Sequence, residues 1–134
     1  MKPGLTIGLT AETLVCVTAD MCPHFEGVLV HPVYATWIMV RDMEVTGRKL
    51  LAPYLEPHEE GVGAHIRVDH RSPATIGARV LIRAEATAVT AHKLTCRMTA
   101  TCDNRLVGQG EFVQVLLSKT RLEALLATHG KGSG

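Results

Sequence analysis

The stretch from Val33 to Leu51, VYATWIMVRDMEVTGRKLL, decides the fold. It contains no proline and a single glycine, Gly47, and it lies between Pro32 and Pro53. Apolar side chains would surround a helix of this sequence on nearly all sides; they are Val33, Ile38, Met39, Val40, Met43 and Val45. A pattern this wide predicts one long, buried central helix that ends near Pro53.

After Pro57 apolar and polar residues alternate with a period of two, which is typical of antiparallel strands that expose one face to solvent. Three such segments cover residues 64–71, 79–88 and 92–100. The predicted inward residues are Ala64, Ile66, Val68 and His70, then Val80, Ile82, Ala84, Ala86 and Ala88, then His92, Leu94, Cys96, Met98 and Ala100. A fourth, more apolar strand is predicted over residues 107–117.

The two ends of the chain complete the order of elements. A strand is predicted over residues 10–19, and a loop containing Pro23, Gly27 and Pro32 follows it. A short closing helix is predicted around Leu122, Leu125 and Leu126. One strand, one long helix and four consecutive strands is the order of the hotdog fold, an α+β fold in which a curved antiparallel sheet wraps a central helix.

We expect residues 1–134 to form a single hotdog domain, with residues 130–134 as a disordered tail. One copy of this fold leaves sheet edges and part of the helix uncovered. Because an unpaired edge presents free N–H and C=O groups to another chain, we expect a homodimer or a higher homo-oligomer.

The composition excludes several classes of protein. Lys and Arg number 14 against 13 acidic residues, a net charge of +1, which argues against a partner such as nucleic acid or a membrane surface. Apolar residues make up 46% and charged residues 20% of the chain, which is typical of a globular protein and excludes disorder. No stretch reaches the ~18 apolar residues of a membrane span or has the pattern of a signal peptide, so we expect a cytoplasmic protein.

The cysteines indicate neither a metal site nor a disulfide framework. Cys16, Cys22, Cys96 and Cys102 lack CxxC spacing, and no His-x-x-x-His motif follows them. We interpret all four as small buried apolar residues in a reducing compartment.

Three polar residues fall on otherwise apolar elements. Glu44 lies between Met43 and Val45 in the central helix, and a buried carboxylate must find donors, stay protonated or face a cavity. His70 has the inward parity of its strand. Thr36 lies eight residues before Glu44, which is about 80° around and ~12 Å along a helix, so no direct bond between them is expected. The two could flank a substrate or contribute to sites built from two subunits.

Each of these residues also has a purely structural interpretation. Glu44 could be capped by backbone or an arginine, His70 could be a satisfied core histidine, and Thr36 could bond to a preceding carbonyl. Gly63, at the start of the strand that carries His70, could mark a bulge or close packing, or it could bring a backbone N–H close to a ligand carbonyl.

At these positions the sequence resembles the fluoroacetyl-CoA thioesterase family of hotdog proteins. The resemblance runs without a gap from about Val33 to Gly77 and continues more weakly to about Leu122. It includes Tyr34-Ala35-Thr36, the unusual run Ala52-Pro53-Tyr54-Leu55-Glu56-Pro57, and Gly63 seven residues before His70. Thr36, Glu44 and His70 match the catalytic threonine, glutamate and histidine of the family, and Gly63 matches the glycine whose backbone lies against the bound acyl group.

The resemblance implies hydrolysis of an acyl-CoA thioester, with no cofactor besides the coenzyme A of the substrate. We expect His70 to act as general base, with Thr36 as nucleophile or positioning hydroxyl. Glu44 would orient His70 or the attacking water, and the Gly63 N–H would contact the oxyanion or acyl group. Lys119 and Arg121, after the last strand, are candidates for binding the coenzyme A phosphates.

The sequence departs from the family at its aromatic lid. The lid positions fall on Gly27 and Val30 by ungapped counting, with Phe25 nearby. The resemblance therefore implies hydrolysis of some acyl-CoA, and fluoroacetyl-CoA is not necessarily the substrate.

Three alternatives remain open on the sequence alone. The first is a non-catalytic acyl-CoA-binding hotdog module that acts as a sensor or effector domain. The second is a hotdog hydratase, although no Asp-x-x-x-x-His pairing of the kind that this chemistry needs is present. The third is a structural protein with a vestigial pocket.

Overall fold

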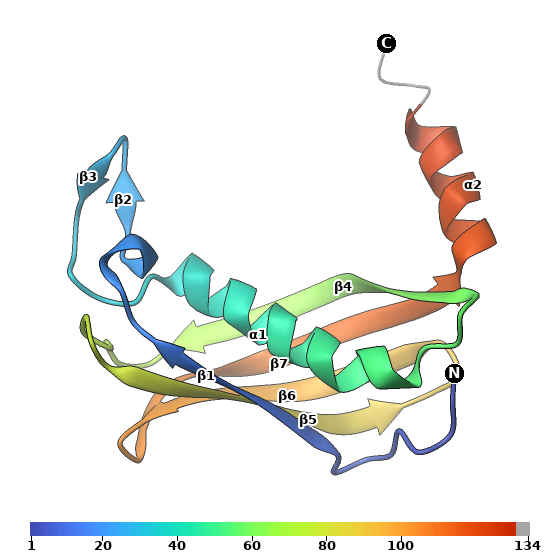
Figure 1. Ribbon diagram of the computed structural model, residues 1–134, viewed down its shortest axis with the longest axis horizontal. Helices are drawn as coiled ribbons and strands as arrows, with labels where there is room; N and C mark the ends of the chain where they lie inside the picture. Colours follow the sequence, from blue (N-terminus) through green and yellow to red (C-terminus); the bar gives the residue numbers. More distant parts are fainter. Residues whose placement is uncertain (131–134) are drawn as a thin grey trace.

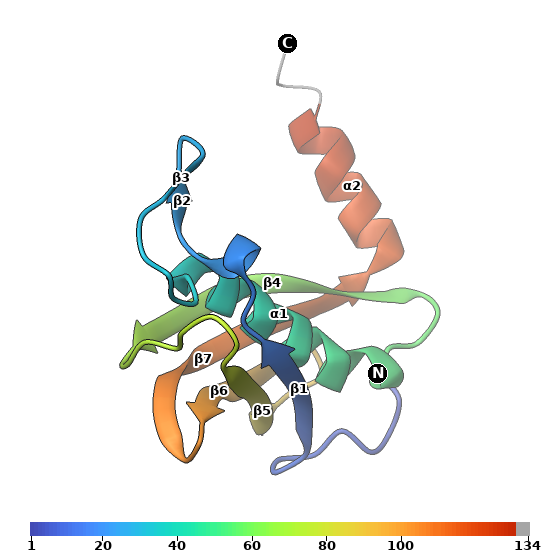
Figure 2. The ribbon, with the colours of Figure 1, turned by 60° about the vertical axis from the view of Figure 1, so that its left-hand side comes forward.

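The computed structural model describes residues 1–130, in which a curved antiparallel sheet lies along one side of a long helix (Figure 1). Within these residues the main sheet has five strands in the order β1-β5-β6-β7-β4. The strands are β1 (Thr10–Cys16), β4 (Glu59–His70), β5 (Arg79–Val89), β6 (Lys93–Cys102) and β7 (Arg105–Ser118), and the helix is α1 (Thr36–Leu51). Figure 2 shows the sheet curving around α1, which confirms the predicted α+β arrangement.

Two smaller parts stand at opposite ends of the sheet (Figure 1). A hairpin of β2 (His24–Phe25) and β3 (Val28–Leu29) rises near the beginning of α1, where the sequence predicted a loop. At the other end, α2 (Lys119–Gly130) leaves the last strand and projects away from the sheet.

The C-terminal helix is present but does not close over the core. None of its 12 residues is buried, and Leu126 is 63% exposed. The prediction of a closing helix is therefore correct in position and wrong in its packing. The predicted tail begins with Gly130, which is the last residue of α2, and its other residues, 131–134, lie outside the described residues. No helix in the described part of the chain is both long and apolar enough to span a membrane.

Helix α1 begins at Thr36, three residues later than predicted, because Val33 to Ala35 are extended and tied to another segment. The Tyr34 backbone N–H donates to the Ala74 carbonyl at 2.8 Å, and Val33 forms an isolated bridge with Thr75. The last turn passes into a single 3-10 turn, Ala52–Tyr54, which contains the expected proline.

The prediction that α1 is buried on nearly all sides is wrong. The sheet covers only one side of the helix, and the buried residues on that side are Met39, Asp42, Met43, Thr46, Gly47, Leu50 and Leu51. On the opposite side Trp37 is 48% exposed and Val45 is 54% exposed. In a single copy, therefore, apolar side chains of α1 remain in contact with solvent.

The inward faces of the strands follow the predicted alternation and build the core against α1. The largest fully buried side chains of the sheet are Val80, Ile82, Leu94, Met98 and Val107. Two irregularities change the predicted faces. One residue is inserted in β5 between Ala86 and Ala88, and Ala88 is exposed instead of inward. His92 lies before β6 and is also exposed.

Strand β4 begins at Glu59, earlier than predicted, and carries a bulge between Gly63 and His65. The inserted residue, Ala64, is exposed rather than inward. A bulge shifts the parity of a strand by one residue. As a result Gly63 faces the helix although it lies an odd number of residues before His70.

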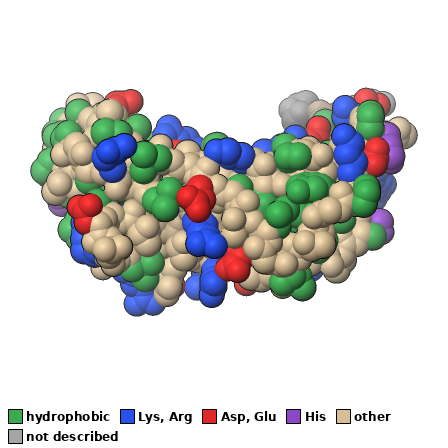
Figure 3. Space-filling view, turned by 60° about the horizontal axis from the view of Figure 1, so that its bottom comes forward, with side chains coloured by type: hydrophobic (Ala, Val, Ile, Leu, Met, Phe, Trp, Pro, Cys, Tyr) green, Lys and Arg blue, Asp and Glu red, His purple; other side chains and the backbone are tan. Residues whose placement is uncertain are grey.

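The outer face of the sheet is charged, as the alternation predicted (Figure 3). Glu85, Arg97, Glu111 and Arg67 are cross-strand neighbours on four adjacent strands. Arg97 forms an ion pair with Glu85 at 2.7 Å. This row of alternating charges keeps the outer face in water.

All four cysteines are free. Cys22, Cys96 and Cys102 are buried, as expected. Cys16 is exposed, so its predicted burial is wrong: it alternates with the buried Val15 and Val17 near the end of β1.

Candidate active site

The structure brings Thr36 and His70 into direct contact. Thr36 is the first residue of α1 and His70 is the last residue of β4. Thr36 Oγ1 lies 2.8 Å from His70 Nδ1, which is hydrogen-bond distance. The two meet because the segment that leads into α1 pairs with the segment that follows His70, through Tyr34 and Ala74.

The surroundings of His70 favour a neutral imidazole. Burial lowers the pKa of His70 below its ordinary value of 6.5, and a contact with the Ser72 backbone offsets part of this effect. When Thr36 donates to Nδ1, the imidazole proton resides on Nε2. Nε2 is buried and has no hydrogen-bond partner among residues 1–130. With Thr36 as the donor, its hydroxyl would be bonded to a neutral imidazole.

Glu44 does not join this pair within one protomer. It is exposed, contrary to the expectation of a buried carboxylate, because it lies on the side of α1 that the sheet does not cover. Its Oε1 lies 3.4 Å from the position that a Cβ on Gly63 would occupy. Glu44 thus lies beside the first half of β4, whereas His70 ends that strand.

Gly63 lies on the helix-facing side of β4 as a consequence of the bulge. A Cβ at this position would also lie 3.4 Å from Phe112 Cε1. The glycine therefore leaves a narrow space between the strand, the Glu44 carboxylate and the Phe112 ring. The structural interpretation of Gly63, a bulge with close packing, fits this geometry.

Lys119 and Arg121 lie far from His70 in the same protomer. Both are exposed in the first turn of α2. The Lys119 backbone N–H donates to the His58 carbonyl at 2.8 Å, and Ser118 pairs with Glu59, the first residue of β4. A strand of this length spans roughly 35–40 Å, so the two basic residues and His70 are at opposite ends of β4.

The predicted site residues thus form two groups. Thr36 and His70 lie at the end of β4, and Glu44, Gly63 and the two basic residues lie along its first half and beginning. No single protomer brings the two groups together.

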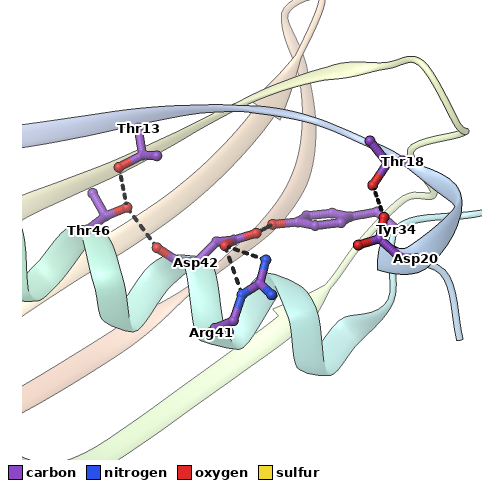
Figure 4. Close-up of polar contacts among 7 residues, drawn as sticks. All are labelled: Thr13, Thr18, Asp20, Tyr34, Arg41, Asp42 and Thr46. Carbon is purple, nitrogen blue, oxygen red and sulfur yellow. Dashed lines mark hydrogen bonds and ion pairs between the residues drawn. The ribbon is translucent and has the colours of Figure 1, made fainter.

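A polar network next to the site was not predicted (Figure 4). Tyr34 is fully buried, and its hydroxyl donates to Asp42 Oδ2 at 2.5 Å. Arg41 Nη2 donates to the other oxygen of Asp42 at 3.1 Å. The sequence contained one sign of this network. Asp42 is the only acidic residue among the buried residues of α1, and a buried carboxylate needs hydrogen-bond donors.

The residues at the expected lid positions, Gly27 and Val30, are not aromatic, and the aromatic side chains of this region are Phe25 and Trp37. Glu26 and Gly27 both have positive φ, 53° and 80°, and form the tight turn between β2 and β3. Gly27 is thus at the tip of the hairpin. Phe25 instead packs edge-on against Trp37, with ring centroids 5.6 Å apart, and both rings remain about half exposed.

One hollow of about 390 Å³ lies away from this site, on the outer face of the sheet, and is lined by Arg67, Thr87, Arg97, Gln109, Gly110 and Glu111. In residues 1–130 no three His, Cys, Asp or Glu side chains form a group that could hold a metal ion. The candidate residues offer a hydroxyl and an imidazole in contact, and α1 carries the Glu44 carboxylate beside the first half of β4.

Comparisons with known proteins give concordant results. A curated relative, the fluoroacetyl-CoA thioesterase of Streptantibioticus cattleyicolor, is 32% identical over 92 residues, which are 69% of this chain and 66%, just under two thirds, of that protein. The structure of a Thermus thermophilus hypothetical protein of the thioesterase superfamily has a TM-score of 0.89 and 35% identity over 96% of each chain. A hot-dog-like protein of Thermanaerovibrio acidaminovorans shares the fold, with a TM-score of 0.84 and 18% identity over 96% of this chain and 93% of its own.

The family model described as fluoroacetyl-CoA-specific thioesterase matches residues 17–120. This match includes Thr36, Glu44, Gly63 and His70. Because it covers well over half of the 134 residues, the chain belongs to the family of fluoroacetyl-CoA-specific thioesterases.

Proposed function

We propose that this protein hydrolyses the thioester of an acyl-CoA to a free acid and coenzyme A. The observation that carries the proposal is the 2.8 Å contact between Thr36 Oγ1 and the Nδ1 of a largely neutral His70. A hydroxyl bonded to a neutral imidazole is the arrangement of a nucleophile and its general base. A solved variant of the fluoroacetyl-CoA-specific thioesterase, 26% identical to this chain, holds fluoroacetate and CoA, which supports a substrate of the same class.

In the proposed reaction His70 takes a proton and later returns it. If Thr36 is the nucleophile, its Oγ1 attacks the thioester carbonyl while Nδ1 accepts the hydroxyl proton. The C–S bond then breaks, the coenzyme A thiolate takes that proton, and water hydrolyses the acyl-Thr36 ester with His70 again as base. If water attacks directly, Thr36 orients it and His70 accepts its proton. Both routes remain open.

The developing oxyanion needs hydrogen-bond donors. Thr36 begins a 16-residue helix, and the first N–H groups of a helix have no intrahelical acceptor and carry the positive end of its dipole. We propose these groups and the Gly63 N–H as the donors.

We further propose that the complete site is assembled from two copies of the chain. Strand β4 is one of the two edge strands of the sheet, and within residues 1–130 it pairs only with β7. If two copies pair antiparallel along β4, the first half of the partner's strand lies beside the last half of this one. Glu44 of the partner subunit then approaches Thr36 and His70.

The same pairing accounts for the distant basic residues. Lys119 and Arg121 begin α2, beside the first residues of β4. Antiparallel pairing would place these first residues of one copy near His70 of the other copy. The partner's Lys119 and the partner's Arg121 would then lie on the side where the coenzyme A phosphates leave the site. A homodimer also covers the free edge of β4 and the exposed apolar face of α1, which would otherwise favour nonspecific association.

For the acyl group we propose an apolar substituent that contacts Phe25 and Trp37. Trp37 follows Thr36 in the chain, Phe25 packs against Trp37, and each ring leaves about half of its surface open. The expected lid positions carry Gly27 and Val30, so the aromatic surface of this chain differs from that of the fluoroacetyl-selective member. Fluoroacetyl-CoA is therefore one substrate to be tested among several.

Three further expectations belong to this proposal. The reaction needs no cofactor, since coenzyme A is part of the substrate. A cytoplasmic location is supported by the four free cysteines. The organisation of residues 1–134 as one domain stays a prediction.

One observation favours a second candidate, a non-catalytic acyl-CoA-binding module. In a single copy Glu44 does not contact His70, and His70 Nε2 has no partner within residues 1–130. Such a module would bind acyl-CoA at the same residues and would lack turnover.

Release of free thiol from acetyl-, fluoroacetyl-, branched, aromatic and long-chain acyl-CoAs separates the two candidates. For the enzyme, His70→Ala should lower kcat at least about 100-fold, because the general base is lost. Glu44→Ala should also lose activity. His92→Ala, which removes an exposed histidine from the turn before β6, serves as the matched control and should leave activity unchanged. Tight binding of acyl-CoA without thiol release would instead support the binding module.

A further inference from the structure

Thr36 lies at a position that is weakly held by its own helix. It is the first residue of α1, and the N-cap residue, Ala35, makes no side-chain capping hydrogen bond. Helices without a capping side chain fray at this end, because the first N–H groups lack acceptors. The Thr36 hydroxyl is engaged with His70 rather than with the backbone of its helix. Something else must hold Thr36 in place.

The side chain of Tyr34 supplies one such restraint (Figure 4). Tyr34 is two residues before Thr36 and fully buried. Its hydroxyl donates to Asp42 Oδ2 at 2.5 Å, eight residues further along and well inside α1. This bond ties the chain before the helix to the second turn of the helix.

Asp42 is itself held from two sides. Its other carboxylate oxygen accepts hydrogen bonds from Arg41 Nη2 and Nε, at 3.1 and 3.2 Å. Its backbone carbonyl accepts from Thr46 Oγ1 at 2.7 Å, and Thr46 Oγ1 lies 2.9 Å from Thr13 Oγ1 on β1. These hydrogen bonds hold Asp42 in place relative to α1 and β1.

The backbone of Tyr34 connects the same point to His70. The Tyr34 N–H donates to the Ala74 carbonyl at 2.8 Å, and Ala74 is four residues beyond His70. The bridge between Val33 and Thr75 extends this pairing. One residue thus joins the segment that carries Thr36, the body of α1 and the segment that follows His70.

We infer that the Tyr34–Asp42 hydrogen bond is a positioning device that holds Thr36 Oγ1 at reacting distance from His70. Neither residue touches the reacting atoms, so both are positioning residues. The inference rests on the proposed function in so far as Thr36 and His70 perform the reaction. It goes beyond that function, because nothing in the chemistry of thioester hydrolysis requires a buried tyrosine–aspartate pair.

Burial and the neighbouring carboxylate raise the pKa of Tyr34, so its hydroxyl keeps its proton and remains a donor. The device therefore works unchanged over the pH range in which His70 titrates.

Two substitutions test the hydrogen bond while preserving side-chain volume. Tyr34→Phe removes only the donor, and Asp42→Asn keeps an acceptor oxygen for it. For Tyr34→Phe we expect kcat to fall about 10- to 100-fold with KM within twofold of wild type, because a small displacement of an attacking group has effects of this size. Asp42→Asn should retain most of the activity. Leu94→Val is the control, since it changes a fully buried side chain of β6 that takes no part in the Tyr34–Asp42 network.

All four proteins are compared at a temperature where thermal unfolding shows each to be folded. If Tyr34→Phe and Leu94→Val lower the melting temperature alike and both keep wild-type kcat, the pair only stabilises the fold and the inference is overturned. A fall in kcat confined to Tyr34→Phe supports positioning.

An NMR readout tests the inference independently of activity. The ¹⁵N shift of His70 Nδ1 reports its hydrogen bond with Thr36. We expect this shift to change in Tyr34→Phe and to stay as in wild type in Leu94→Val and Asp42→Asn. If no acyl-CoA is hydrolysed by the wild type, the proposed function fails, whereas an unchanged Nδ1 shift in Tyr34→Phe overturns the positioning role in either case.

Discussion

His70 is the residue whose protonation state decides the proposed reaction. As a base it must be neutral, and burial lowers its pKa below 6.5. We therefore expect kcat/KM to rise with pH to a plateau, with an apparent pKa below 6.5, and to stay level through pH 8. Initial rates from about pH 5 to 8 measure this profile. An apparent pKa above 6.5 would contradict the role of this residue as base.

The same shift predicts a pH dependence of stability. The folded state binds the His70 proton less tightly than the unfolded state, so protonation favours unfolding. The stabilisation is complete above pH 6.5 and is lost as the pH falls from 6.5 towards the lower pKa of the folded state. Urea unfolding of wild type and His70→Gln across this range tests the sign. If the two free energies of unfolding vary in parallel with pH, His70 is not the group responsible.

Replacement by alanine should destabilise the protein strongly at one glycine of β7 and only slightly at one glycine of β4. A Cβ on Gly110 would lie 1.8 Å from the Arg67 carbonyl oxygen, which is backbone and cannot move aside, so Gly110→Ala should lose about 3 kcal/mol or more. A Cβ on Gly63 would meet Glu44 and Phe112 at 3.4 Å. Gly63→Ala should therefore fold, with a change in the free energy of unfolding below ~1 kcal/mol.

The activity of Gly63→Ala carries the functional part of this prediction. The added methyl group would fill the space between β4 and the Glu44 carboxylate, so kcat/KM should fall although the protein is folded. Chemical denaturation and steady-state rates on the same samples separate the two effects. Wild-type rates in folded Gly63→Ala would show that this glycine serves only the bulge.

At the scale of elements, α2 contributes little to the core. Because none of its residues is buried, a chain that ends at Ser118 should keep its fold, with a melting temperature within a few degrees of the full chain. A large loss of stability would mean that α2 packs against another copy.

The charges at the start of α2 should act on substrate binding. Replacing Lys119 and Arg121 together by alanine should raise the KM for acyl-CoA about 3- to 10-fold and weaken its dependence on ionic strength, with kcat unchanged. Lys93→Ala, at the beginning of β6, is a control for the loss of an exposed charge. An equal effect of both changes would exclude a specific contact with the phosphates.

Helix α1 shows how far an element can be predicted from its pattern. Its existence and its end follow from the proline-free apolar run, because such a run favours a helix in any fold. Its beginning does not, since Val33 to Ala35 are extended through pairing with Ala74 and Thr75, which are distant in sequence. The width of the apolar pattern suggested complete burial. In one copy the sheet covers one side only.

At the scale of the whole molecule, mixing two inactive variants tests the two-copy site. His70→Ala and Glu44→Ala homodimers each lack a required residue in both sites. In a mixed dimer one site combines the intact His70 of one chain with the intact Glu44 of the other. Random assortment after unfolding and refolding together should then restore about a quarter of wild-type activity.

Light scattering of the same samples should show a dimer or a larger oligomer. Absence of recovery in a mixed sample that contains dimers would show that each chain carries its own complete site. A monomer would contradict the assembly altogether.

The order of the main strands and helices, the inward faces of most strands and the membership of the family could all be predicted from the residues alone. These properties depend on local periodicity and on motifs within one continuous segment, from Val33 to Gly77. The sequence also named Thr36, Glu44, Gly63 and His70, whose catalytic roles stay predictions.

Only the tertiary structure decided which of these residues meet. The contact between Thr36 and His70, the separation of Glu44 from both and the Tyr34–Asp42 bond all depend on how α1 lies against β4. The alternation of apolar and polar residues in β4 did not indicate the bulge at Ala64. This bulge turns Gly63 towards the helix. Such features arise because register, bulges and the path of a helix across a sheet are set by packing between segments distant in the chain, which no local pattern encodes.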